Sequence, residues 1–182
     1  MSWVYEPELT LLTPRVRLRP LTVDDDQAIF RRIAHDREVL NYFIMDYAED
    51  EARFSMARSI EICNKSRKHI LALESRESGE VMGMLLMCSA PDPVFNGCEL
   101  GLALGREYQR QGFGSEATRA FMDYLFRMGV HKVWAGCISE NEASRRTLEK
   151  CGMRFEGVRK DEIFYRGRYW DECVYYRLET DE

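Results

Sequence analysis

Alternation of apolar and polar residues predicts the strands of this chain. In the segment 16–21, valine and leucine alternate with arginine, which is the period of a half-buried strand. Tight turns with glycine at 78–79 and 166–168 are typical of hairpins. Further strands are predicted at 69–74, 81–89, 98–104, 133–139, 153–164 and 169–178.

A period of 3.6 residues predicts four helices. The clearest runs from 115 to 128, where apolar residues at i, i+3, i+4 and i+7 form one stripe before Gly129 ends it. Another begins at Thr22 and extends to about residue 34, because the aspartates at 24–26 favour a helix N-terminus. The other two are predicted at 50–64, with Ala52, Met56, Ile60 and Cys63 on one face, and at 142–150, closed by Gly152.

Strands and helices in this order predict a mixed α/β (α+β) fold around one main sheet. No internal repeat, low-complexity tract or linker divides the 182 residues, so one domain covering residues 1–182 is expected. A strand leads into a loop and then directly into the clearest helix at 98–128, in the middle of this pattern.

Composition narrows the partners. A formal net charge of -5 argues against a duplex nucleic acid, because such binding needs a basic surface. No stretch approaches the roughly 20 apolar residues of a membrane span, and the first eight residues do not resemble a secretory signal. A cytoplasmic protein is expected, with its six cysteines as buried thiols and zinc as a remote alternative.

The loop at 109–115 carries the most chemical information. Gly112 and Gly114 let the backbone turn and approach a ligand, and the first N–H groups of the following helix lack internal partners. With Arg110 beside them, they form a candidate site for phosphate or pyrophosphate. By itself such a loop is more often a plain strand-to-helix connection, because glycine-rich loops are common. It matches neither a P-loop nor the dinucleotide fingerprint.

Four motifs in chain order resemble the GNAT superfamily of acetyltransferases. Gln109-x-x-Gly112-x-Gly114 is similar to its Q/R-x-x-G-x-G/A signature, and Asn141-x-x-Ser144 follows at the distance that the superfamily shows. The opening at 13–19 and the ending Gly167-Arg168-Tyr169-x-Asp171 look most like the Rim-type ribosomal-protein N-terminal acetyltransferases. The order of elements agrees from the strand at 16 to that at 169.

This resemblance implies a mixed, mostly antiparallel central sheet, splayed to hold acetyl-CoA and flanked by about four helices, with no metal. Backbone groups of Leu102, Ala103 and Leu104 would bind the pantetheine arm as an added strand. The implied pyrophosphate contacts are Gln109, Arg110, Gln111, Gly112, Phe113, Gly114 and Ser115. Asn141 and Ser144 would line the opposite wall.

The resemblance also implies catalytic residues. Glu99 is the expected base, acting directly or through water, or else an ion-paired residue at the strand edge. Many members carry a tyrosine acid where this chain has Leu148, and Ser144 is the suggested substitute, or else a capping hydroxyl. Some Rim-type members place a carboxylate where this chain has Ile163. Glu162 is adjacent, and strand alternation predicts that it faces the other way.

The expected acceptor is a primary amine, either a small molecule or a protein N-terminus, with no nucleic acid or membrane partner. The first two helices would form part of the acceptor wall, where the acidic run 46–51 either attracts a cationic amine or starts a helix. A coenzyme A sensor without turnover, a nucleotide-binding regulator, and either a monomer or a homodimer remain open. The three histidines share no spacing for a metal or a triad.

Overall fold

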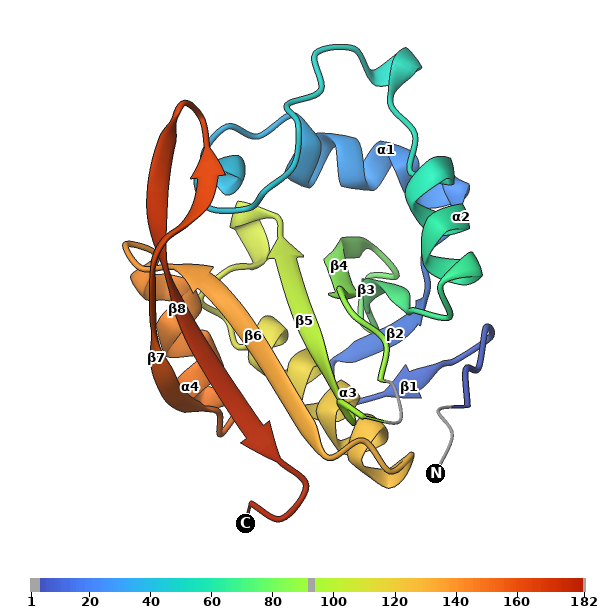
Figure 1. Ribbon diagram of the computed structural model, residues 1–182. Helices are drawn as coiled ribbons and strands as arrows, with labels where there is room; N and C mark the ends of the chain where they lie inside the picture. Colours follow the sequence, from blue (N-terminus) through green and yellow to red (C-terminus); the bar gives the residue numbers. More distant parts are fainter. Residues whose placement is uncertain (1–3, 92–93, 182) are drawn as a thin grey trace.

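One eight-stranded sheet organises the structure, in the order β1-β2-β3-β4-β5-β6-β8-β7 (Figure 1). The computed structural model describes residues 4–91 and 94–181. The strands are β1 (Leu11–Leu12), β2 (Val16–Pro20), β3 (Ile70–Ser75), β4 (Val81–Met87), β5 (Gly97–Leu104), β6 (Lys132–Ile138), β7 (Arg154–Tyr165) and β8 (Arg168–Leu178). Neighbours are antiparallel except β5 and β6, which confirms a mixed, mostly antiparallel sheet.

The helices are α1 (Asp26–Ile29), α2 (Ala57–Lys65), α3 (Phe113–Arg127) and α4 (Glu142–Lys150). A 3₁₀ turn at Val23–Asp25 precedes α1 and a π-helical turn at Phe30–Ala34 follows it, so the helical segment covers the range predicted from Thr22. Gly129 and Gly152, at φ 84° and 81°, end α3 and α4 as predicted. The short β1, paired with β2, was not predicted.

The prediction for the second helix was wrong at its start. Asp50 caps only a 3₁₀ turn at Glu51–Arg53, and Phe54 then takes an extended conformation. The helix α2 begins only after Met56, whose N–H donates to the carboxylate of Asp26 at 2.9 Å. A side chain 30 positions away therefore holds the residue before this helix in place, which the local sequence cannot show.

Two cores lie on the two faces of the sheet. One packs the sheet against α3 and α4 and includes Phe121, Leu125 and Tyr175. The other packs it against the α1 segment and α2 and includes Ile29, Ile33 and Met84. In Figure 1, α3 and α4 lie behind β5, β6 and β8, while α1 and α2 lie towards β2–β5. The outer part of the sheet, β6–β8–β7, thus has one face that these helices leave open.

All six cysteines are free thiols. Four are buried, as expected from their apolar surroundings, and Cys63 is half-buried. Cys88 is exposed just after β4, so the expectation of burial was wrong for this residue.

Candidate functional site

The sheet splays between β5 and β6. Their parallel pairing comprises Gly97 with Lys132, Cys98 with Val133, and Glu99 with Trp134. Beyond Glu99, β5 remains paired with β4 up to Leu104, while β6 continues beside β8. Figure 1 shows the two strands diverging from this short contact towards α1. The sheet therefore holds a gap bordered by the second half of β5.

The register of β4 and β5 decides which backbone groups face this gap. Cys88 N–H donates to the carbonyl of Glu99 and Gly105 N–H to that of Met82, which identifies the hydrogen-bonded pairs. Because such pairs alternate, the N–H and C=O groups of Leu102 and Leu104 point away from β4 and into the gap.

The same alternation turns the backbone of Ala103 towards Met84. The side chain of Ala103 is buried on the α1 face. Its assignment to the added-strand contact therefore does not fit this register. The groups available to a ligand strand are the N–H and C=O of Leu102 and the N–H of Leu104, because the Leu104 carbonyl accepts from the Gln109 side chain.

The loop before α3 presents N–H groups in a concave arrangement. Arg110 and Gly112 both have positive φ, 61° and 85°. This conformation curls successive backbone amides around one point, as in anion-binding nests. Phe113, Gly114 and Ser115 supply the first-turn N–H groups of α3, which have no helical partner. The loop meets the geometric requirements of a pyrophosphate site.

Side chains of this loop hold its shape. Gln109 Nε2 donates to the carbonyl of Leu104 at 2.9 Å, and Gln111 Nε2 donates to the carbonyl of Glu107. The hydroxyl of Ser115 donates to the carbonyl of Gly112 at 3.0 Å. Gln109, Gln111 and Ser115 therefore hold the loop in shape through their side chains. The backbone N–H of Gln109 donates to the carbonyl of Arg106, so the backbone amides left for a ligand are those of Gln111 and Ser115.

A clamp from the N-terminal segment secures the loop against α3. Glu116 Oε1 accepts from the Thr13 hydroxyl at 2.6 Å, and Glu116 Oε2 accepts from Arg15 Nε at 2.7 Å. Arg15 also donates to the carbonyl of Gln111 and lies over the Phe113 ring. Burial alone would raise the pKa of Glu116, but these hydrogen bonds outweigh burial and lower it.

The α4 wall lies on the same face of the sheet as α3. Asn141 caps α4, its Oδ1 accepting from Ser144 N–H at 3.1 Å. The Ser144 hydroxyl lies against the thiol of Cys137, whose pKa is raised to about 11 by burial and lowered in part by this hydroxyl. Leu148 is buried in the core on this face, and its side chain has no proton to donate.

Glu99 faces the opposite side of the sheet. Its backbone pairs with Trp134, and alternation along β5 places its side chain on the face of Ala103. Burial raises the pKa of Glu99, the carboxylate of Glu172 raises it further, and Arg159 partly offsets the rise. A half-buried carboxylate with a raised pKa at the point where the strands part is suited to accept a proton.

Glu172 is a site residue that the sequence analysis missed. It is buried on β8, and its carboxylate occupies the space where a side chain at Gly136 would stand. Arg159 Nη1 donates to its Oε2 at 3.0 Å. Since Gly136 lies two residues beyond Trp134, this carboxylate stands at the mouth of the gap. Gly136 pairs with Val174, two residues from Glu172 on β8, and a glycine on β6 diagonally across from an acidic residue on β8 was the signal available.

Simple strand alternation does not hold around Glu162. The pairing of β7 with β8 shifts between Arg159 and Ile163, and Asp161 has a φ of 51°. The bulge breaks the alternation, and Glu162 lies 3.8 Å from the guanidinium of Arg159. Arg159 therefore serves two carboxylates, Glu172 and Glu162.

The β7–β8 hairpin packs against the segment that follows the α1 turn. The Tyr165 hydroxyl donates to the carbonyl of Leu40 at 3.0 Å, and Arg166 donates to Asn41 Oδ1 at 2.8 Å. Trp170 packs edge-on against Tyr42. These contacts join the hairpin to the segment after the α1 turn, so two regions distant in sequence form one wall. The carboxylate-bearing residues Asp46, Glu49, Asp50 and Glu51 are exposed beyond it.

His69 is a buried histidine packed among aromatic side chains. Burial lowers the pKa of His69 to about 4, so this histidine is neutral within its aromatic neighbours. Within residues 4–91 and 94–181, no group of three His, Cys, Asp or Glu side chains is arranged to hold a metal ion. No helix in these ranges is long and apolar enough to cross a membrane.

Known proteins are similar to this chain in sequence and in fold. The family profile described as "Acetyltransferase (GNAT) domain" matches residues 15–154. The uncharacterised N-acetyltransferase YoaA of Bacillus subtilis (strain 168) is 30% identical over 168 residues, which cover 91% of this chain and 94% of YoaA. The ribosomal protein uS5-alanine N-acetyltransferase of Escherichia coli (strain K12) is 28% identical over 96 residues, 52% of this chain and 50% of that enzyme.

A solved structure with low sequence identity to this chain has the same fold. The spermidine N-acetyltransferase of Vibrio cholerae, in complex with CoA and spermine, superposes with a TM-score of 0.76 at 22% identity. The superposition covers 93% of this chain and 98% of that one.

Proposed function

The chain belongs to the GNAT family of acetyltransferases, and from that membership we propose that it transfers the acetyl group of acetyl-CoA to the α-amine of a polypeptide N-terminus. Acetyl-CoA-dependent N-acetylation is the activity of the family. The acceptor, the residue roles and the extent of the domain, residues 1–182, are the proposal.

The observation that supports the coenzyme site is the gap beside β5. Leu102 and Leu104 direct backbone groups into it, and the amide nest at 110–112 lies beyond Leu104 along the chain. An amide-bearing pantetheine arm matches the first feature and a pyrophosphate matches the second. Gly114 permits this arrangement, because a Cβ there would come within 2.8 Å of Leu102 Cδ2. The residues present fit the coenzyme.

In the proposed mechanism, the two faces of the sheet divide the chemistry. Glu99, on the open face, takes the proton of the attacking amine, directly or through water. Leu102 N–H stabilises the negative charge that develops on the carbonyl oxygen. As the C–N bond forms and the C–S bond breaks, the thiolate leaves on the α4 side. Ser144, or solvent, returns a proton to it there.

Glu172 and Arg159 adjust the base in this scheme. The carboxylate of Glu172 keeps the proton affinity of Glu99 high, and Arg159 limits that effect. Glu172 is thus a positioning residue, held by Arg159 and by the absence of a side chain at Gly136.

An α-amine needs less help from a base than a lysine side chain does, because more of it is neutral at pH 7. With a pKa of about 8, roughly one-tenth of it is neutral at pH 7, whereas a lysine side chain is neutral about once in two thousand. A single carboxylate base suits the first case. The likeness to a ribosomal-protein alanine N-acetyltransferase supports the same class.

A panel of amines tests the acceptor. Release of free CoA thiol from acetyl-CoA is measured with short peptides that differ in their first residue, with N-terminally blocked peptides carrying lysine, and with spermidine. We expect turnover with free α-amines and little with blocked peptides. Turnover with spermidine alone would reject the peptide assignment while leaving the acetyltransferase intact.

A further inference from the structure

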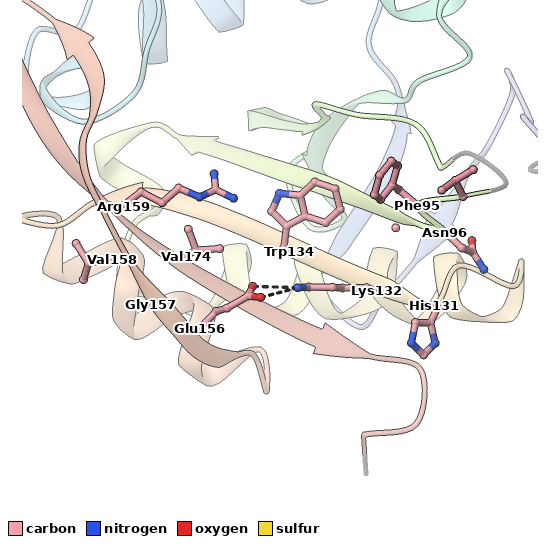
Figure 2. A pocket seen from close by; sticks show the side chains of 12 residues that line it. Phe95, Asn96, His131, Lys132, Trp134, Glu156, Gly157, Val158, Arg159 and Val174 are labelled. Carbon is pink, nitrogen blue, oxygen red and sulfur yellow. Dashed lines mark hydrogen bonds and ion pairs between the residues drawn. The ribbon is translucent and has the colours of Figure 1, made fainter.

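A groove runs along the open face of the sheet from the reaction centre. It is formed by the loop before β5 and by β6, β8 and β7, and has a volume of about 630 Å³ (Figure 2). Ligand pockets are typically about 300–1,000 Å³, so the groove is much larger than an amine alone requires. We name it the Trp134 groove, after the indole that stands on its floor in Figure 2.

The Trp134 groove has apolar walls. Phe95 and Val158 are 74% and 44% exposed, and Val174 lines the groove between Trp134 and β7. Figure 2 shows Phe95 at one end and Val158 at the other, with the indole between them. Apolar side chains left facing solvent along one concave surface are typical of a binding site.

Charged groups of the groove are already paired. Lys132 Nζ donates to both oxygens of Glu156, at 2.8 and 3.0 Å, and His131 contacts Glu179 at 2.9 Å. Among the described lining residues, Glu156 is the one carboxylate. A second ammonium group would meet no unpaired carboxylate along these walls, whereas an apolar group would bury both its own surface and that of the groove.

The groove is continuous with the reaction centre. Trp134 is the strand partner of Glu99, and Arg159, which lines the other end, binds Glu172. A molecule whose amine lies at Glu99 therefore has the groove beside it for its next atoms.

We infer that the Trp134 groove receives the apolar side chain that follows the reacting α-amine, so the acceptor is a polypeptide whose second or third residue is aromatic or aliphatic. This inference rests on the proposed function. It identifies the groove as the element that selects among N-termini and that disfavours polyamines.

The test compares kcat/KM for peptides that share one first residue and carry Phe, Leu, Asp or Lys at the second and third positions. We expect at least a tenfold preference for the apolar peptides. Phe95→Ala, at an exposed position, is expected to reduce that preference several-fold. Val158→Glu is expected to shift it towards the lysine peptides, and Leu12→Glu, at an exposed position on β1, is expected to leave it unchanged.

Contrary outcomes separate the two hypotheses. Equal kcat/KM for all peptides, unaltered by Phe95→Ala and Val158→Glu, would reject the groove and keep peptide acetylation. Acetylation of spermidine but of no peptide would reject the proposed function itself. If Val158→Glu instead dissociates an oligomer, measured by light scattering, and leaves the peptide preference unchanged, the groove is covered by a second copy and the inference is wrong.

Discussion

The carboxylate of Glu172 fills the place of the missing side chain at Gly136. A Cβ at Gly136 would collide with Glu172 Oε1, so the glycine and the acid determine each other's positions across β6 and β8. Gly136→Ala is expected to lower the stability by about 1–3 kcal/mol through overpacking, and to reduce kcat as Glu172 is displaced.

A double variant separates these two effects. Gly136→Ala combined with Glu172→Ala removes the collision, so thermal unfolding is expected to recover towards the wild type while kcat stays low. Full recovery of kcat in the double variant would show that Glu172 has no part in positioning the base.

Replacing Glu99 is expected to separate activity from stability. A carboxyl whose pKa is raised by folding stabilises the fold when protonated, and this contribution is lost as the pH rises through the raised pKa. Above that pKa the charged Glu99 therefore weakens the fold. Glu99→Gln is expected to lower kcat by about 10²–10⁴-fold, with the melting temperature unchanged or raised. Calorimetry should show unaltered CoA binding; a parallel loss of CoA affinity would indicate a structural role.

The pH dependence of kcat/KM should report the surroundings of Glu99. Activity is expected to fall on the acid side as Glu99 protonates, at a pH above the ordinary range for glutamate. Glu172→Gln removes a neighbouring negative charge, so the acid limb should move to lower pH. Glu77→Gln, at an exposed position in the β3–β4 turn, is the matched control and should leave the limb in place. An acid limb that does not move in Glu172→Gln would contradict the coupling.

Two glycines with similar positive φ can separate an effect on CoA binding from an effect on folding stability. Gly112 and Gly79 have φ of 85° and 73°. Alanine at either position is expected to lower the stability by about 1–2 kcal/mol. Only Gly112→Ala should also weaken CoA binding, by about tenfold or more, because it deforms the amide nest. Gly79→Ala leaves the nest intact, since a Cβ there has nothing within 4 Å. Equal CoA affinity in both variants, measured by calorimetry, would place the pyrophosphate elsewhere.

The clamp on the loop gives a further prediction. Glu116→Gln removes the charge that Arg15 binds, and the stability is expected to fall by about 1–2 kcal/mol with a several-fold rise in KM for acetyl-CoA. Glu142→Gln is the control, because Glu142 also lies in the first turn of a helix and pairs with exposed Arg146. Its loss should be about 0.3–0.5 kcal/mol with KM unchanged. An equal rise in KM for the two variants would contradict a specific clamp.

Local patterns predicted most of the elements, because a strand or helix with one buried face repeats its apolar residues at its own period. They could not predict the start of α2, which depends on Asp26 and Met56 meeting in space. Nor could the deviation from alternation at Asp161, which brings Glu162 to Arg159, be predicted from residue types.

For the site, the motifs predicted the loop before α3 and the acid at Glu99. The register that turns Ala103 away from the gap was not predictable, since alternation within β5 does not say which neighbour each backbone group faces. Glu172 was missed for a related reason: its closeness to Glu99 arises from the order β5-β6-β8, two strands apart in the sheet.

The short pairing of β5 with β6 has a consequence for how the molecule unfolds. Three residue pairs join one half of the sheet to the other, and beyond them the ladder is interrupted. Amide protons at this junction should exchange with solvent through openings smaller than global unfolding. A coenzyme that hydrogen-bonds to both strands bordering the gap would replace the missing backbone hydrogen bonds between them. The two halves of the sheet would then open as one cooperative unit. The substrate would then stabilise, in the manner of an added strand, the same protein that consumes it.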